Sequence, residues 1–214
     1  MNASLIANLT IAALPLIFAI TLHEAAHAYV ARYFGDDTAA RLGRITLNPL
    51  SHIDPFGTLL LPAGLFLLSG GQFAFGYAKP VPVNFARLKN PKADMLWVAA
   101  AGPCANLLMV IAWALLHKLV FNVPVNPYTQ ALVSMCLFGV TFNLVLMLLN
   151  LLPLPPLDGG RIVVSLLPMR QAIAFSRLEP YGMIILLILI LTKALDAILL
   201  PLLNFSFLLL RPFL

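Results

Sequence analysis

The chain alternates long apolar runs with short polar segments. Four of the runs reach about twenty residues or more, the length that a helix needs to cross the hydrocarbon core of a bilayer. They cover residues 5–33, 95–116, 131–152 and 181–203. The first should end near Gly35, a glycine stop followed by two turn-forming aspartates. The pattern therefore predicts four membrane-spanning helices.

A fifth apolar run, residues 59–69, is marginal for a span. Pro62 and Gly64 interrupt it, and turn-forming residues flank it. Irregular backbone at membrane depth is tolerated only where protein or a water-filled cavity surrounds it. For residues 57–70 both a crossing and a re-entrant segment are possible, and the sequence favours re-entry because basic residues lie on both sides.

The composition agrees with a membrane protein. Hydrophobic residues make up 61% of the 214 residues and charged residues 10%, which is too apolar for a soluble domain. No polar stretch is long enough for a separate soluble unit, so residues 1–214 are expected to form one domain. The predicted fold class is an all-α polytopic membrane protein with about four to six transmembrane or re-entrant helices.

Basic residues gather on one predicted side of the membrane. They occur throughout residues 32–92 and 161–177, whereas residues 122–130 carry no charge. By the positive-inside rule, the N-terminus and the uncharged loop lie outside, and both basic segments face the cytoplasm. These residues flank spans instead of forming a stripe with aromatic side chains, so the net charge of +5 does not indicate nucleic-acid binding.

The first predicted span contains the sequence His23-Glu24-Ala25-Ala26-His27. Histidines four positions apart lie on one helix face, about 6 Å apart, so both imidazoles can reach one metal ion. The intervening glutamate can then take a proton from a water on that metal, as in H-E-x-x-H metallohydrolases. The motif predicts metal-assisted peptide hydrolysis. The alternative is two packing histidines with a polar glutamate between them.

A second polar segment, residues 150–161, follows the third long run. It holds three prolines in four positions, then Asp158 and two glycines. The prolines stop the preceding helix, and the glycines allow close backbone approach. We expect Asp158 to complete a shell of two histidines and one carboxylate, with the fourth position left for water. The alternative is a turn aspartate that caps a short helix beginning near Gly160.

Together these motifs resemble the site-2 protease family of intramembrane zinc metalloproteases, peptidase family M50, in its short form without a PDZ domain. The resemblance extends from about residue 15 to residue 168. The segments that carry it are His23-Glu24-x-x-His27, Gly43-Arg44, Asn48-Pro49-Leu50, Lys79-Pro80-Val81-Pro82-Val83-Asn84, Gly102-Pro103-Cys104-Ala105-Asn106, Asn150-x-x-Pro153 and Leu157-Asp158-Gly159.

The resemblance implies one zinc ion per chain, with His23, His27 and Asp158 as ligands and Glu24 as the base. It implies that transmembrane segments of protein substrates are cleaved near the cytosolic face of the bilayer, which we expect to be a prokaryotic inner membrane. It also suggests a small β element at the membrane surface. Residues 79–84 alternate prolines with β-branched residues, which suits an edge strand that could hold an unwound substrate by strand addition.

Two asparagines are further candidates for the site. Asn106 and Asn150 are buried amides in the resemblance, and either could donate a hydrogen bond to the developing oxyanion or position the substrate. Physical chemistry alone makes them equally plausible as polar residues that pack helices together. His52 and Asp54 are left open between a supporting role near the site and a solvated turn.

Two other functions are possible for a membrane protein with these motifs, a non-catalytic helix-binding protein and a metal transporter. A non-catalytic relative that binds membrane helices should lack Glu24 or one of the three ligands, and all four are present. A metal transporter should carry acidic or histidine residues along several helices, whereas here they converge on two segments. Cys104 and Cys136 lie within predicted spans, where we expect small packing residues. The sequence therefore favours a zinc-dependent intramembrane endopeptidase.

Overall fold

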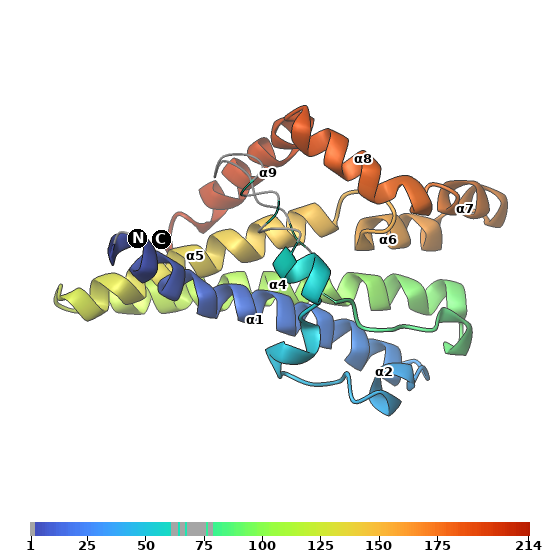
Figure 1. The fold of residues 1–214 in the computed structure, drawn as a ribbon, viewed down its shortest axis with the longest axis horizontal. Helices are drawn as coiled ribbons and strands as arrows, with labels where there is room; N and C mark the ends of the chain where they lie inside the picture. Colours follow the sequence, from blue (N-terminus) through green and yellow to red (C-terminus); the bar gives the residue numbers. More distant parts are fainter. Residues whose placement is uncertain (1–2, 61–63, 65–66, 68–75, 77–78) are drawn as a thin grey trace.

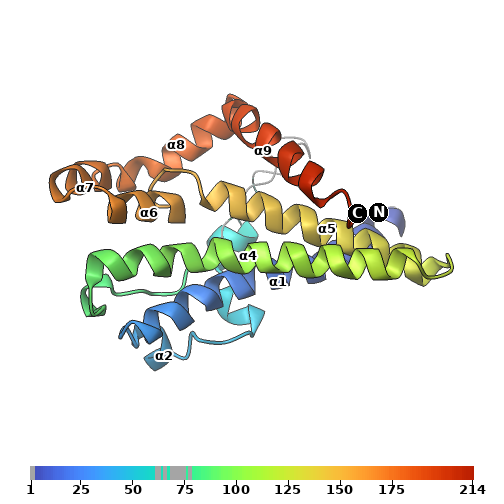
Figure 2. The ribbon, with the colours of Figure 1, turned by 180° about the vertical axis from the view of Figure 1, so that it is seen from behind.

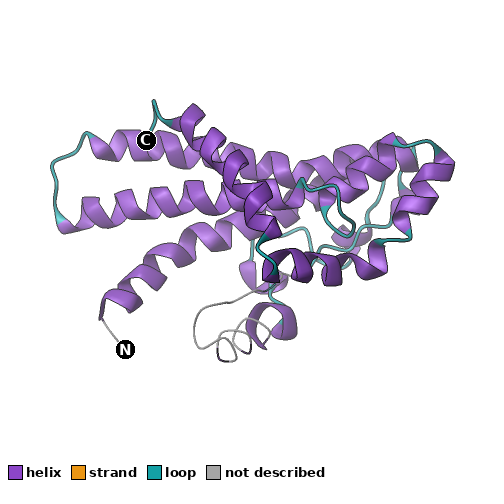
Figure 3. Ribbon diagram, turned by 90° about the horizontal axis from the view of Figure 1, so that it is seen from above, coloured by secondary structure: helices purple, strands orange, loops and turns teal. Residues whose placement is uncertain are grey.

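The structure is a computed structural model that describes residues 3–60, 64, 67, 76 and 79–214 (Figures 1 and 2). All regular secondary structure in the described part is helical, as the all-α prediction requires (Figure 3). Its helices are α1 (Ala3–Tyr33), α2 (Thr38–Arg41), η1 (Pro49–His52), η2 (Pro55–Leu60), η3 (Phe85–Arg87), α4 (Pro91–Phe121), α5 (Pro127–Asn150), α6 (Asp158–Leu166), α7 (Met169–Ser176), α8 (Glu179–Leu191) and α9 (Ala194–Leu210).

Three long helices, α1, α4 and α5, pack side by side and form the core (Figures 1 and 2). The segments Thr10–Tyr33, Pro91–Phe121 and Pro127–Asn150 are each long and apolar enough to cross a membrane. Buried histidines and asparagines face the inside of this core, whereas large apolar side chains such as Leu108 and Leu119 are exposed on its outside. This distribution suits a lipid environment, and the first three predicted spans are confirmed.

Local sequence explains where the long helices begin and end. Asn126 caps α5 through a capping box with Thr129, and Pro127 occupies the first turn, where a missing N–H costs nothing. Pro91 likewise occupies the first turn of α4. The chain leaves α1 at Gly35, whose φ of 108° is the positive value that glycine tolerates best. The predicted glycine stop is therefore confirmed.

The predicted span 181–203 is wrong as a single helix, because the chain breaks into α8 and α9. Lys193 adopts a left-handed conformation with φ 58°, and the Thr192 hydroxyl bonds back to the carbonyl oxygen of Ile188. At 13 residues, α8 is about 20 Å long, which is too short to cross alone. It reaches spanning length only together with α7, from which it is bent by 60°. Lys193 and Asp196, three positions apart, form no ion pair within the described part of the chain.

The expected small β element is absent from the described residues. Residues 79–84 are extended, as predicted, but they pair with no strand in the described part of the chain. Their backbone instead bonds to side chains and to one loop carbonyl. The proposed re-entrant run, residues 59–69, lies largely outside the described residues, and η2 ends at Leu60, within its first two residues.

The polar segments that connect the helices lie at the two ends of the core (Figures 1 and 2). The loop between α4 and α5 lies at the same end as the two chain termini, whereas α7 and the beginning of α4 lie at the opposite end. At that opposite end the Lys92 ammonium donates to the carbonyl oxygen of Leu167, joining α4 to the α6–α7 connection. The segments expected on one side of the membrane therefore lie together.

Candidate metal centre and active site

His23 and His27 project from α1 into the core, and both are buried. Their Nε2 atoms are 3.1 Å apart, as the one-turn spacing predicts. His23 Nδ1 lies 2.6 Å from Oδ1 of Asn106, and His27 Nδ1 lies 2.7 Å from the carbonyl oxygen of Val98. Two contacts from α4 thus orient both rings so that their Nε2 atoms face the same point.

Asp158, the first residue of α6, brings its carboxylate to the same point. Its Oδ2 atom lies 3.2 Å from Nε2 of His23 and 3.2 Å from Nε2 of His27. The helix is capped by Leu157 without a side-chain hydrogen bond, so Asp158 does not serve as the capping aspartate of the alternative interpretation. Instead its buried Oδ2 has no hydrogen-bond partner.

Hydrogen bonding determines which ring nitrogens carry protons. A carbonyl oxygen only accepts, so His27 Nδ1 must donate to Val98. For His23, the proton follows from a chain of three hydrogen bonds. The amide nitrogen of Asn143 donates to the Gly139 carbonyl, so the Oδ1 atom of Asn143 accepts from the amide nitrogen of Asn106. The remaining Oδ1 atom of Asn106 must then accept from His23 Nδ1. With both Nδ1 atoms protonated, neutral histidines present lone pairs at Nε2.

With both rings neutral, as metal-binding imidazoles are, three acceptor atoms, two Nε2 and one carboxylate oxygen, converge within 3.2 Å. Such an arrangement is repulsive unless a cation lies among them. Tetrahedral zinc, with bonds of about 2.0 to 2.1 Å, spaces its ligands about 3.3 Å apart. The observed separations of 3.1 and 3.2 Å fit one face of that tetrahedron. His23, His27 and Asp158 could hold a metal ion here.

Close backbone packing brings Asp158 to the histidines. A Cβ at Gly159 would overlap the carbonyl oxygens of Leu151 and Leu152, and a Cβ at Gly160 would overlap the backbone of Pro155. From the other side, a Cβ at Gly182 in α8 would lie 2.6 Å from the carbonyl carbon of Pro155. The expectation that glycines allow close approach after the acid is confirmed.

Gly102 gives the histidines their space on α4. A Cβ added there would lie 2.6 Å from His23 Nε2 and would overlap His27 Nε2. Any side chain at this position would therefore enter the space between the candidate ligands. This contact supplies a physical reason for glycine in the Gly102-Pro103-x-x-Asn106 element.

Glu24 is half-buried on the same helix, between the two histidines in sequence. Its Oε2 accepts a hydrogen bond of 2.7 Å from the backbone N–H of Val81. No other hydrogen bond to Glu24 occurs in the described part of the chain, so Oε1 is free to accept a proton. The residue thus lies next to the candidate ligands in the sequence, with one carboxylate oxygen held and one available.

The two asparagine candidates have different surroundings. Asn106 is fully buried, and its amide nitrogen donates to Asn143 and to the carbonyl oxygen of Ala19, at 2.9 and 3.2 Å. Asn150 is half-buried and donates once, to the carbonyl oxygen of Leu146. Asn106 therefore has no spare donor, whereas Asn150 retains one N–H that no described residue accepts.

Sequence reasoning missed Asn143, the buried amide that completes the chain of hydrogen bonds to His23. A signal was present, because it is an amide in an apolar span, two helical turns before Asn150 and so on the same face of α5. His52 is buried and its Nε2 contacts the Thr46 carbonyl, while Asp54 accepts from the N–H of Phe56. Neither belongs to the cluster of candidate ligands.

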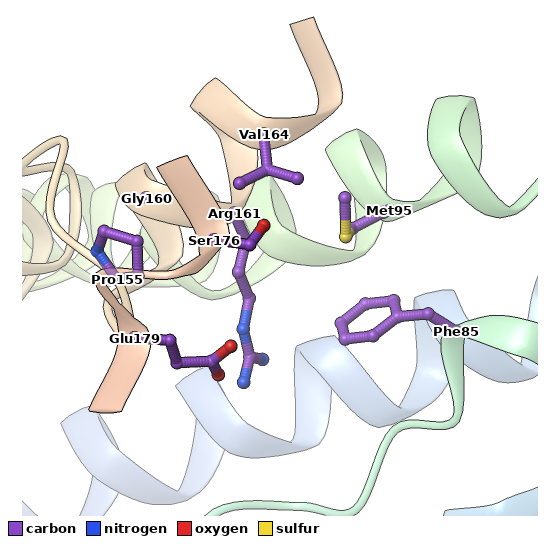
Figure 4. Close-up of a pocket in the computed structure, with 8 residues that line it drawn as sticks. All are labelled: Phe85, Met95, Pro155, Gly160, Arg161, Val164, Ser176 and Glu179. Carbon is purple, nitrogen blue, oxygen red and sulfur yellow. The ribbon is translucent and has the colours of Figure 1, made fainter. Parts of the chain in front are cut away.

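A pocket of about 200 Å³ lies beside α6, between η3, α4, α7 and α8 (Figure 4). Arg161, one turn after Asp158, extends into it with its guanidinium 5.4 Å from the ring centre of Phe85. Glu179 lies on the same pocket wall without forming an ion pair with it. No described residue accepts a hydrogen bond from the Arg161 guanidinium.

Comparisons with known proteins agree with this geometry. The model of peptidase family M50 matches residues 119–192. A protein of Bacillus subtilis named "Putative zinc metalloprotease YwhC" is 42% identical over 192 residues, which are 88% of this chain and 84% of that protein. Proteins of Mycolicibacterium smegmatis and Mycobacterium tuberculosis, both named "Putative zinc metalloprotease Rip2", are 30% and 31% identical over 84% of this chain and 66% of their own length. No solved structure matches the chain significantly.

The chain therefore belongs to peptidase family M50, the site-2 protease family of zinc metalloproteases. It is an integral membrane protein and a metalloprotease.

Proposed function

We propose that this protein is a zinc-dependent endopeptidase that hydrolyses peptide bonds within or near the transmembrane segments of membrane-protein substrates. The observation that carries the proposal is the convergence of two imidazole nitrogens and one carboxylate oxygen, within 3.2 Å, inside a bundle of membrane-spanning helices. The whole chain, residues 1–214, would act as one catalytic domain.

His23, His27 and Asp158 would hold one zinc ion per chain. When bound, zinc would act as a Lewis acid, activating a water molecule and polarising the scissile carbonyl. Glu24 would be the general base, with its free Oε1 taking a proton from the attacking water and passing it to the leaving nitrogen. This division of roles agrees with the spare acceptor on Glu24 and with the convergence of the three candidate ligand atoms.

The asparagines would divide the remaining tasks. Asn106 would position His23, because both of its N–H groups are already used in the core. Asn150 would be the donor to the developing oxyanion, because one of its two N–H groups has no acceptor among the described residues.

The depth of the site supports a transmembrane substrate. Helix α1 continues from His23 to Tyr33, about 15 Å along its axis, so the site would lie inside the bilayer and not at its surface. The positive-inside rule puts the Tyr33 end in the cytoplasm and the site in the cytoplasmic half of a prokaryotic inner membrane. A helical substrate must unwind before hydrolysis, because its peptide bonds are shielded and internally bonded. The extended residues 79–84 would receive the unwound segment.

The proposal can be tested with the protein in proteoliposomes and a synthetic peptide that contains one transmembrane segment. We expect mass spectrometry to locate the cut within or next to that segment, and substrates with a central proline or glycine to be cleaved faster. Glu24→Gln protein is the control for a contaminating protease. Binding of the peptide without cleavage would indicate the non-catalytic alternative, and cleavage of soluble peptides only would contradict an intramembrane substrate.

A further inference from the structure

The hydrogen bond between Glu24 and Val81 joins the candidate base to a segment far away in the sequence. The N–H of Val81 lies 2.7 Å from Oε2 of Glu24. Pro80 and Pro82, its neighbours on either side, have no N–H to donate. Val81 is therefore the only residue of this Pro-Val-Pro stretch whose backbone can donate a hydrogen bond, and its single N–H is directed at Glu24.

The surroundings hold this donor in place. The Val81 side chain is 7% exposed and packs with Ala28 and Ala39, so α1 and α2 fix it from one side. The guanidinium of Arg44 donates to the carbonyl oxygens of Lys79 and Pro80, the two residues before Val81, at 3.0 and 3.3 Å. Three residues after Val81, the N–H of Asn84 donates at 2.6 Å to Oδ2 of Asp36, a buried residue of the loop between α1 and α2.

Glu24 itself lacks a comparable restraint. A glutamate has three rotatable side-chain bonds, and no other hydrogen bond to this carboxylate occurs among the described residues. Without Val81, the carboxylate could rotate away from the histidines. With the bond in place, Oε2 is held, and the rotation that would change the direction of Oε1 is restricted.

We propose that the backbone N–H of Val81 is a positioning group for catalysis, which holds the Glu24 carboxylate so that Oε1 meets the attacking water. This inference rests on the proposed role of Glu24 as the base. It gives residues 79–84 a second task besides receiving the substrate. The segment fixes the geometry of the base, so a displacement of the segment would slow the chemical step.

The test compares Val81→Pro, which removes the N–H, with Val81→Ala, which keeps the N–H but loses most of the side chain. The flanking prolines already favour an extended backbone, so a third proline suits the conformation. Leu47→Pro, in the exposed loop before η1, is the control for introducing a proline. All variants are compared with wild type and Glu24→Gln for kcat, KM and bound zinc.

We expect Val81→Pro to lower kcat about 10- to 100-fold, with KM and zinc content close to wild type, because a small misplacement of a catalytic group has this cost. Val81→Ala should lower kcat at most about threefold, since the positioning bond remains. A role in substrate binding alone would raise KM and leave kcat unaffected, which would overturn the inference.

Two other results separate the inference from the proposed function. Wild-type kcat in Val81→Pro together with an inactive Glu24→Gln would overturn the inference alone, whereas an active Glu24→Gln would overturn the base itself. If Val81→Pro loses zinc or fails to fold, an ester at position 81, made with the α-hydroxy acid analogue of valine, removes the N–H without a ring. Loss of zinc in the ester variant would show a structural role and contradict positioning.

Discussion

Gly102 on α4 lies directly against His27 on α1, so that a Cβ at position 102 would overlap the Nε2 atom of His27. The same Cβ would lie 2.6 Å from His23 Nε2. The two atoms it would displace are the candidate nitrogen ligands. The space for a metal ion therefore depends on the absence of one methyl group from a neighbouring helix.

Gly102→Ala should accordingly lose most of its zinc and its cleavage activity while the helical bundle still forms. The methyl group must push one or both imidazoles off the metal position, and a site of three protein ligands tolerates little displacement. Zinc measured by mass spectrometry on the purified protein, together with helicity by circular dichroism, checks this. Gly64→Ala, where a Cβ meets no atom of the described residues within 4 Å, is the control. Full zinc in Gly102→Ala would contradict the proposed metal position.

Replacing any one of the three proposed ligands should lower the zinc content sharply. His23→Ala, His27→Ala and Asp158→Ala each leave only two protein ligands, which bind zinc much more weakly than three. His117→Ala is the control, since His117 is a buried histidine of α4 that contacts the Phe213 carbonyl instead of the cluster. Zinc at wild-type level in Asp158→Ala would exclude that residue as a ligand.

Asn106→Leu should weaken zinc binding about 10- to 100-fold without abolishing it, the usual effect of removing a hydrogen bond that orients a metal-binding histidine. The substitution removes the acceptor for His23 Nδ1 and frees the ring to rotate or change tautomer. Zinc titration against a chelator measures the affinity. Asn122→Ala, an exposed amide at the end of the same helix, should bind zinc like wild type. Equal affinity in both variants would show that Asn106 does not position His23.

The orientation in the membrane predicts which cysteines a reagent can reach. In a background of Cys104→Ala and Cys136→Ala, we expect Asn126→Cys to be labelled by an impermeant maleimide added to intact cells. Lys89→Cys and Arg170→Cys should react only after the cytoplasm is opened, because these basic ends are expected inside. The reverse pattern would overturn the orientation and move the active site to the outer half of the bilayer.

The sequence predicted the core of the fold because apolar length is a direct consequence of bilayer thickness. It therefore found α1, α4 and α5, and the glycine and proline signals predicted where α1 and α5 end. It could not predict the break between α8 and α9, since Thr192 and Lys193 carry no glycine or proline signal. Lys193 adopts its left-handed conformation where α8 packs against the loop before α6 and α9 packs against α5. These are tertiary contacts that no local pattern specifies.

The site divides in the same way. His23, Glu24 and His27 are recognisable because helical spacing alone puts them on one face, and Asp158 because it follows an irregular segment that a membrane helix would avoid. The Val81 N–H is a backbone group without a residue-type signal, so only the packing of an extended segment on α1 reveals it. The convergence of three acceptor atoms likewise can be recognised only when the tautomers of His23 and His27 are known. These tautomers follow from contacts between helices that are distant in the sequence.

Glu24→Gln tests the central claim most directly, because it separates chemistry from metal binding. Glutamine keeps the size of the side chain but cannot take a proton from water. Measured on one preparation, zinc content should match wild type while cleavage of the transmembrane peptide falls by at least about 10² to 10⁴, the usual contribution of a positioned acid or base. Wild-type cleavage by the zinc-loaded Glu24→Gln protein would contradict the account, because Glu24 would then not be the base.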